Sequence, residues 1–152
     1  MKAENCGANC SECPLRDSEE IVYPERNTGT DVAIVADYPN DFEVQYQRPL
    51  VGPTAKPFAD AMREASVFRG QFFITYSVLC RPPDNNMKKY LATIKTSNRK
   101  LKTLNRQRAK LGQNPLPMIK TPQECCEPRL KKELSKFFKI ITMGTYATKA
   151  VL

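Results

Sequence analysis

Three short apolar runs along the chain predict the strands of a buried parallel sheet. Residues 31–36, 72–79 and 139–143 are rich in β-branched, aromatic or other apolar side chains, and each run ends at a turn. The spacing of apolar residues over 55–65 predicts an amphipathic helix between the first two runs. Strands that alternate with helices imply an α/β fold, a three-layer α/β/α sandwich with a mostly parallel central sheet.

The segments between these runs carry weaker signals. Residues 1–30 show little periodicity and are predicted to form loop or short helix, and residues 42–53 are predicted to form a loop. Residues 126–138 predict a basic helix, and residues 144–152 predict a turn that enters a helix. The run that ends at 79 is expected to be the central strand, with Cys80 at its carboxyl end, where open α/β sheets bind ligands.

Composition favours one globular domain over residues 1–152. The chain is 41% hydrophobic and 26% charged, and it is long enough to bury a core. Its formal charge of +8 and its pI of about 9.3 favour a polyanionic partner, with nucleic acid ahead of a membrane surface. No apolar run is long enough to span a bilayer and no signal peptide is visible, so we expect a cytoplasmic protein without a membrane partner.

Residues 87–120 form a basic segment without a single acidic side chain. Apolar residues within it sit at spacings that fit one or two amphipathic helices, so we expect a helical insertion. Its function is predicted to be the binding of a DNA backbone, in which cationic side chains replace condensed counterions; a solvated surface hairpin is the alternative. The side chains predicted to contact DNA are Lys88, Lys89, Lys95, Arg99, Lys100, Lys102, Arg106, Arg108 and Lys110.

Six cysteines provide the candidate chemistry. Cys10 and Cys13 form a close C-x-x-C pair, Cys80 follows a predicted strand, and Cys125 and Cys126 open a predicted helix. A close pair with distant cysteines is typical of four thiolates around one metal centre. Inert buried cysteines are the alternative, and disulfides are disfavoured in a chain with no secretory signal.

Five motifs occur in a fixed order along the chain. They are Cys10-Ser-Glu-Cys13-Pro-Leu, Arg48-Pro-Leu-Val-Gly-Pro53, Phe73-Ile-Thr-Tyr-Ser-Val-Leu-Cys80-Arg-Pro-Pro, Cys126-Glu-Pro-Arg-Leu130 and Ile140-Ile-Thr-Met-Gly144. Together they resemble the iron–sulfur uracil-DNA glycosylases of the family 4 and 5 type, especially the bacteriophage versions, some of which lead a phage DNA polymerase. Family members continue through further elements that include a late His-Pro-Ser-type loop. This chain contains no histidine, and we expect it to correspond to the front part of that domain.

The resemblance implies a structural [4Fe-4S] cluster held by four of the cysteines. The matching positions are Cys10, Cys13, Cys80 and Cys126. Cys126 is chosen over Cys125 because the family places its cysteine two residues before a proline, as Cys126 stands before Pro128.

The resemblance also implies a pocket for a flipped uracil, and this chain departs from the family at each pocket position. A Gly-Glu-x-Pro-Gly turn becomes Ala36-Asp37-Tyr38-Pro39-Asn40, in which Asp37 keeps the carboxylate beside Tyr38. Leu50 replaces the aromatic residue that stacks on the base. Tyr76 replaces the asparagine that reads the base edge.

We therefore expect an iron–sulfur, DNA-binding domain that acts in phage DNA replication or repair, alone or with a phage DNA polymerase, in the cytoplasm of the bacterial host. The departures argue against ordinary uracil excision. One alternative is an active base-excision glycosylase with a modified pocket, in which Asp37 activates water. Another is a zinc-stabilised module that binds nucleic acid or protein.

Overall fold

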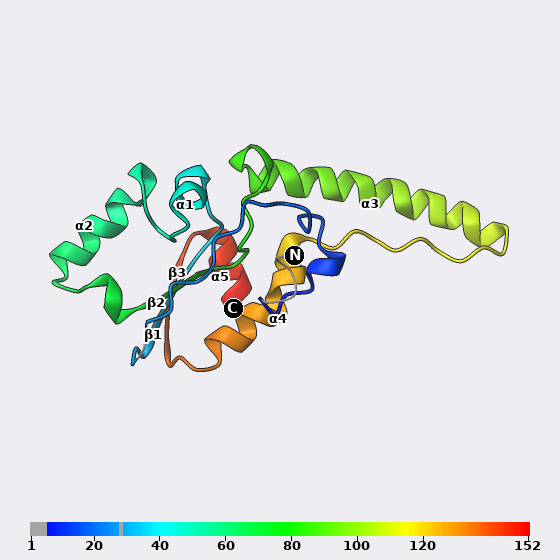
Figure 1. The fold of residues 1–152 in the computed structure, drawn as a ribbon. Helices are drawn as coiled ribbons and strands as arrows, with labels where there is room; N and C mark the ends of the chain where they lie inside the picture. Colours follow the sequence, from blue (N-terminus) through cyan, green and yellow to red (C-terminus); the bar gives the residue numbers. More distant parts are fainter. Residues whose placement is uncertain (1–5, 28) are drawn as a thin grey trace.

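The computed structural model describes residues 6–27 and 29–152 and contains a three-stranded parallel sheet (Figure 1). The strands are β1 (Val32–Ala36), β2 (Phe73–Tyr76) and β3 (Lys139–Met143), in the spatial order β2-β1-β3. All three predicted strands are present, but β1 is the central one, whereas the sequence analysis assigned the centre to the strand before Cys80.

Helices cover both faces of the sheet, which confirms the α/β/α sandwich. Ile34 of β1 packs with Phe58 on one face, and Val35 packs with Leu130 and Ala147 on the other. Neighbouring residues of a strand point to opposite faces, so the apolar strands β1 and β2 are buried on two sides. β3 lies at the edge of the sheet, and its Ile140 and Ile141 are exposed. The helices are α1 (Asp41–Tyr46), α2 (Lys56–Glu64), α3 (Met87–Lys110), α4 (Pro122–Leu134) and α5 (Thr145–Val151).

The amino-terminal segment runs beside the outer edge of β2. Val22 N–H donates to the carbonyl of Leu79 at 3.0 Å, and Glu25 and Ile74 exchange two backbone hydrogen bonds of 2.9 and 3.1 Å. This pairing is antiparallel. It supplies β2 with hydrogen-bond partners on the side away from β1.

The loop predicted over residues 42–53 is wrong in its first part, because α1 begins at Asp41. The Asn40 side chain accepts from Glu43 N–H at 3.0 Å, and the Glu43 carboxylate accepts from Asn40 N–H at 2.7 Å. This reciprocal arrangement is a capping box, which stabilises the first turn of a helix without any apolar periodicity.

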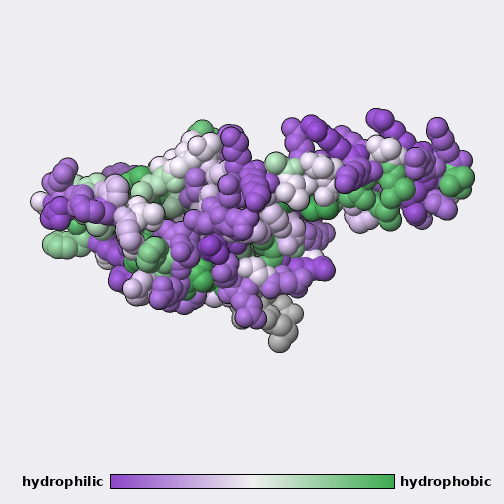
Figure 2. Space-filling view, turned by 90° about the horizontal axis from the view of Figure 1, so that it is seen from above, coloured by the Kyte–Doolittle hydropathy of each residue, from purple (hydrophilic) through white to green (hydrophobic). Residues whose placement is uncertain are grey.

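The basic segment 87–120, called the arm below, projects from the body of the molecule (Figures 1 and 2). It consists of one 24-residue helix, α3, followed by an extended return segment, residues 111–120, that runs back along the helix. None of the described helices, α3 included, combines the length and the apolar character needed to cross a membrane.

Candidate metal centre and base pocket

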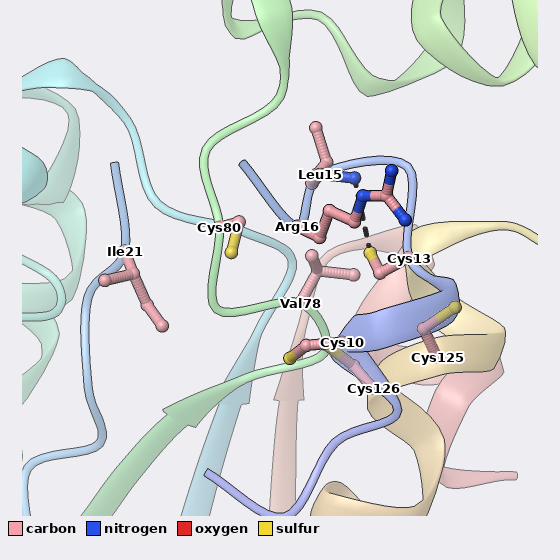
Figure 3. A pocket seen from close by; sticks show the side chains of 9 residues that line it. All are labelled: Cys10, Cys13, Leu15, Arg16, Ile21, Val78, Cys80, Cys125 and Cys126. Atoms are coloured by element: carbon pink, nitrogen blue, oxygen red, sulfur yellow. Dashed lines mark hydrogen bonds between the residues drawn. The ribbon is translucent and has the colours of Figure 1, made fainter. Parts of the chain in front are cut away.

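A cavity lined by thiols lies just beyond the carboxyl end of β2 (Figure 3). Its wall contains all four cysteines selected from the sequence, Cys10, Cys13, Cys80 and Cys126, and also Cys125. The remaining lining residues are Leu15, Arg16, Ile21 and Val78.

Three segments distant in sequence bring these cysteines together. Cys10 opens a short 3-10 helix, η2 (Cys10–Glu12), and Cys13 N–H donates to the Cys10 carbonyl at 3.1 Å. Cys80 follows β2, and Cys126 lies on α4. Asn9 N–H donates to the Cys125 carbonyl at 2.9 Å, which attaches the amino-terminal segment to α4.

The sulfur atoms differ in where they point. Figure 3 shows the sulfurs of Cys10, Cys13 and Cys80 around a common space, while the sulfur of Cys125 points away from it. Cys13 Sγ accepts a hydrogen bond from Leu15 N–H at 3.4 Å. Cys6 Sγ lies 3.7 Å from Cys10 Sγ, so Cys6 reaches the edge of the same group.

Burial disfavours charge on these thiols. It raises the pKa of the Cys13 thiol to about 12, and burial together with a hydrogen bond to Cys6 raises the pKa of the Cys10 thiol to about 12. Burial also raises the pKa of Cys126, against the lowering effect of nearby Arg129. Several thiolates can share this apolar space only if a cationic centre lies between them.

The thiols surround the cavity and do not converge on one point. Within residues 6–27 and 29–152, no group of three Cys, Asp or Glu side chains is close enough to hold a single metal ion. A tetrahedral zinc site requires four ligands about one atom. An iron–sulfur cluster instead binds its four thiolates at separate corners. The chemistry of this donor set fits a cluster better than a lone ion.

Arg129 is a buried residue beside this site that the sequence reasoning missed. Its side chain is 1% exposed, and it donates to the Tyr76 carbonyl at 2.6 Å and to Glu133 at 2.6 Å. It lies three residues after Cys126 on the same face of α4. Its Nε is buried and has no hydrogen-bond partner among the described residues. Arg129 therefore joins the cysteine cavity to the end of β2.

Asp37, the predicted catalytic carboxylate, lies at the carboxyl end of β1 and caps α5. Its Oδ1 accepts from Ala147 N–H at 2.8 Å, in the first turn of that helix. A Cβ atom at Gly144 would lie 2.3 Å from the Asp37 carboxylate, so only glycine fits there. The carboxylate is thus held against a helix N-terminus, which favours negative charge.

Tyr76 and Leu50, two predicted base-pocket positions, contact each other. Tyr76 is completely buried, and its hydroxyl accepts from Leu50 N–H at 3.2 Å. The Tyr76 hydroxyl also hydrogen-bonds to the carboxylate of Glu43; burial first, and this carboxylate second, raise the pKa of Tyr76. Glu43 is itself 4% exposed and accepts from Leu50 N–H at 2.8 Å. The interior at Tyr76 is therefore occupied by a closed hydrogen-bond network.

Tyr38, the last of these positions, packs against α5. Its ring centroid lies 5.9 Å from that of Tyr146, with the two planes tilted by 56°. The ring is partly buried and borders the cysteine-lined core. Tyr38 thus lies between the two candidate sites.

The nine basic side chains predicted to bind DNA all lie on α3, and the tenth basic residue of the arm, Lys120, lies on the return segment. Eight of the nine are exposed, and Arg108 is half-buried. Lys89 forms an ion pair with Asp84 at 3.0 Å. The other seven exposed residues extend along the projecting part of the helix or at its base.

Comparisons with known proteins find a family and two relatives that this chain resembles. A family model described as the uracil DNA glycosylase superfamily matches residues 23–152. A type-4 uracil-DNA glycosylase of Pyrobaculum aerophilum is 37% identical over 78 residues, which is 51% of this chain and 40% of that protein. A type-4 uracil-DNA glycosylase of Thermotoga maritima is 32% identical over 77 residues, 50% of this chain and 40% of that protein. The matched part thus spans about two fifths of the length of each relative.

Proposed function

The chain belongs to the uracil-DNA glycosylase superfamily, and we propose that it is an iron–sulfur, DNA-binding member that excises little or no uracil. The observation that carries the iron–sulfur part of this proposal is that Cys10, Cys13, Cys80 and Cys126 all line one cavity. The four residues come from three segments that are distant in sequence.

In this proposal those four cysteines hold a [4Fe-4S] cluster. When bound, the cluster supplies a cationic core that stabilises the thiolates and ties the amino-terminal segment to β2 and α4. Its contribution is structural. The Leu15 N–H that donates to Cys13 Sγ at 3.4 Å is the type of backbone hydrogen bond that stabilises a cluster thiolate. Zinc remains the alternative metal, and the spread of the thiols around the cavity favours the cluster.

The base-pocket positions support weak or absent uracil excision. Tyr76 is fully buried, and its hydroxyl is hydrogen-bonded to Glu43 and to Leu50 N–H. This position therefore has no side-chain amide with which to read the edge of a base. Leu50 offers no aromatic ring, and stacking is worth about 1–3 kcal/mol per base. Asp37 already caps α5.

A second candidate function is base excision through a modified pocket. Asp37 favours it, because this carboxylate lies at the carboxyl end of β1 and is only partly buried. A carboxylate in this position is able to activate water for attack on the sugar. The cap to Ala147 occupies one oxygen and leaves the other for such a role.

The biological setting in this proposal is phage DNA replication or repair in the cytoplasm of a bacterial host, alone or with a phage DNA polymerase. The support is the resemblance to phage glycosylases and the formal charge of +8, which favours DNA as the partner.

Purification without oxygen tests the metal centre directly. The protein should be brown, with broad visible absorption and about four iron and four sulfide per chain. Cys80→Ser should lose the absorption and most of the soluble protein, whereas Cys6→Ser, a matched change at the edge of the group, should keep both. Full absorption in Cys80→Ser, or stoichiometric zinc in colourless protein, would overturn the cluster assignment.

The same preparation tests catalysis. Incubation with a uracil-containing oligonucleotide, followed by alkaline cleavage of abasic sites, should give no product above the level of heat-denatured protein. Robust release of uracil that depends on the cluster would replace the first function with the second.

A further inference from the structure

The return segment is clamped to α3 by two asparagines. Asn98 donates to the Ile119 carbonyl and accepts from Ile119 N–H, both at 2.8 Å. Asn105 makes the same pair of bonds to Leu116, at 2.9 and 2.7 Å. Each carboxamide thus replaces the strand partner that this extended backbone lacks.

These clamps fix which side of α3 faces outward. Asn98 and Asn105 are seven residues apart, about two turns, so they lie on the same face of the helix. Leu91, Ile94 and Leu101 share that face, and Ile94 is 5% exposed. The side of α3 that carries Leu91, Ile94 and Leu101 is therefore the side that packs against its own chain, whereas Leu104 is exposed.

Most of the basic side chains lie on one flank of α3, beside the packed side. At about 100° per residue, six of them fall within a sector of about 80°. Three basic residues lie elsewhere: Lys89 pairs with Asp84, Arg108 donates to the Asn114 carbonyl at 2.8 Å, and Lys100 points away from the return segment. The flank consists of Lys88, Lys95, Arg99, Lys102, Arg106 and Lys110.

The dimensions of this flank match duplex DNA. Twenty-two residues of helix separate its first and last members, a rise of about 33 Å, which is about one turn of B-form DNA. Segment 87–120 carries no acidic residue to repel phosphates. Figure 2 shows hydrophilic residues gathered along one long edge of the arm, clear of the body.

The flank also lacks the aromatic side chains on which the bases of single-stranded nucleic acid stack. Tyr90 is the only aromatic residue in segment 87–120, and it packs toward the cysteine-lined core at the base of α3. Binding of single-stranded nucleic acid relies on bases stacked on aromatic side chains. Phosphate contacts alone suit a duplex, whose bases stay paired.

We propose that this flank of α3 binds the phosphate backbone of double-stranded DNA without sequence preference, held at a fixed orientation by the asparagine-clamped return segment. The inference rests on the proposed function only in taking DNA as the partner. It requires neither a cluster nor base excision by the chain.

Two double variants that each remove two positive charges test the flank. Arg99→Gln with Lys102→Gln changes the flank, and Lys89→Gln with Lys100→Gln changes the other side of the same helix. Affinity for a 24-base-pair duplex without uracil is measured by fluorescence anisotropy at several salt concentrations. The slope of log affinity against log salt should fall in magnitude by about 1.8 in the flank variant and remain near wild type in the other.

Each other outcome overturns the proposal in a different way. Equal losses in both variants would mean that net charge alone acts. Tighter binding of the matching single strand would remove the duplex assignment. Absence of salt-dependent DNA binding by the wild-type protein would return the flank to an ordinary solvated surface. Visible absorption, recorded on the same samples, reports the metal centre separately, and circular dichroism verifies that α3 is intact.

Discussion

The cysteine cavity and the base-pocket positions are neighbours at one edge of the sheet, but their side chains are used in different ways. In the cavity, thiols from three segments face a shared apolar space. At the base-pocket positions, the polar groups of Asp37 and Tyr76 are bonded within the protein, to α5 and to Glu43. The first arrangement suits a bound group, and the second suits a closed interior.

Under the proposed function, this difference makes the metal centre and the base pocket separable parts of the fold. A cluster that ties three segments together serves any function of the fold, because it acts on stability. A base pocket must keep polar groups unpaired until a base arrives, which costs about 1–3 kcal/mol for each buried group. When base excision is not required, filling the pocket with Tyr76 and Glu43 removes that cost.

The largest effect is expected from Arg129, which belongs to both regions. Arg129→Met keeps the volume but removes the guanidinium that donates to Glu133 and to the Tyr76 carbonyl. Glu133 keeps the Thr75 hydroxyl and the exposed Arg26 as partners. Loss of one partner of a buried ion pair costs about 3–5 kcal/mol. Urea titration should show this decrease in the free energy of unfolding. Lys132→Met, an exposed change on the same helix, should lower the free energy of unfolding by less than about 0.5 kcal/mol. If the two variants lose similar stability, the bonds of Arg129 do not hold the two regions together.

A smaller effect is expected from Glu43, at the centre of the closed interior. Glu43→Gln removes the charge that receives Tyr76 O–H and Leu50 N–H. Hydrogen bonds to charged groups contribute about 1.5–3 kcal/mol, so the free energy of unfolding should fall by that amount. The control Asp41→Asn, an exposed change in the first turn of α1, should cost less than about 1 kcal/mol. A neutral Glu43→Gln would show that the network is not closed.

The strands and the last helix were predictable because their signals are local. Apolar runs marked β1, β2 and β3 within a few residues, and the turn before α5 ended at Gly144. α1 was missed although Asn40 and Glu43 stand at capping-box spacing, because apolar periodicity alone was used there. The position of β1 at the centre depends on pairing between distant segments, which no single run encodes.

The candidate site was predictable only where residue type is informative. A C-x-x-C pair stands out in any sequence, but Glu43 and Arg129 look like ordinary surface charges on short helices. Their roles come from burial against partners distant in sequence: Tyr76 for Glu43, and the end of β2 for Arg129. The burial of such polar residues follows from tertiary packing alone.

The smallest effect on stability, and the sharpest test between the two functions, is expected from Asp37→Asn. An amide oxygen can still accept from Ala147 N–H, so the change mainly removes a negative charge from the start of α5. Such a charge contributes about 0.3–1 kcal/mol, which sets the expected loss in the free energy of unfolding. If Asp37 is only a cap, uracil release stays at background in both proteins. If Asp37 activates water, the wild type releases uracil and the variant is slower by about 10²–10⁴. In that case the edge of β1 would be a working site like the cysteine cavity, and the contrast between the two regions would fail.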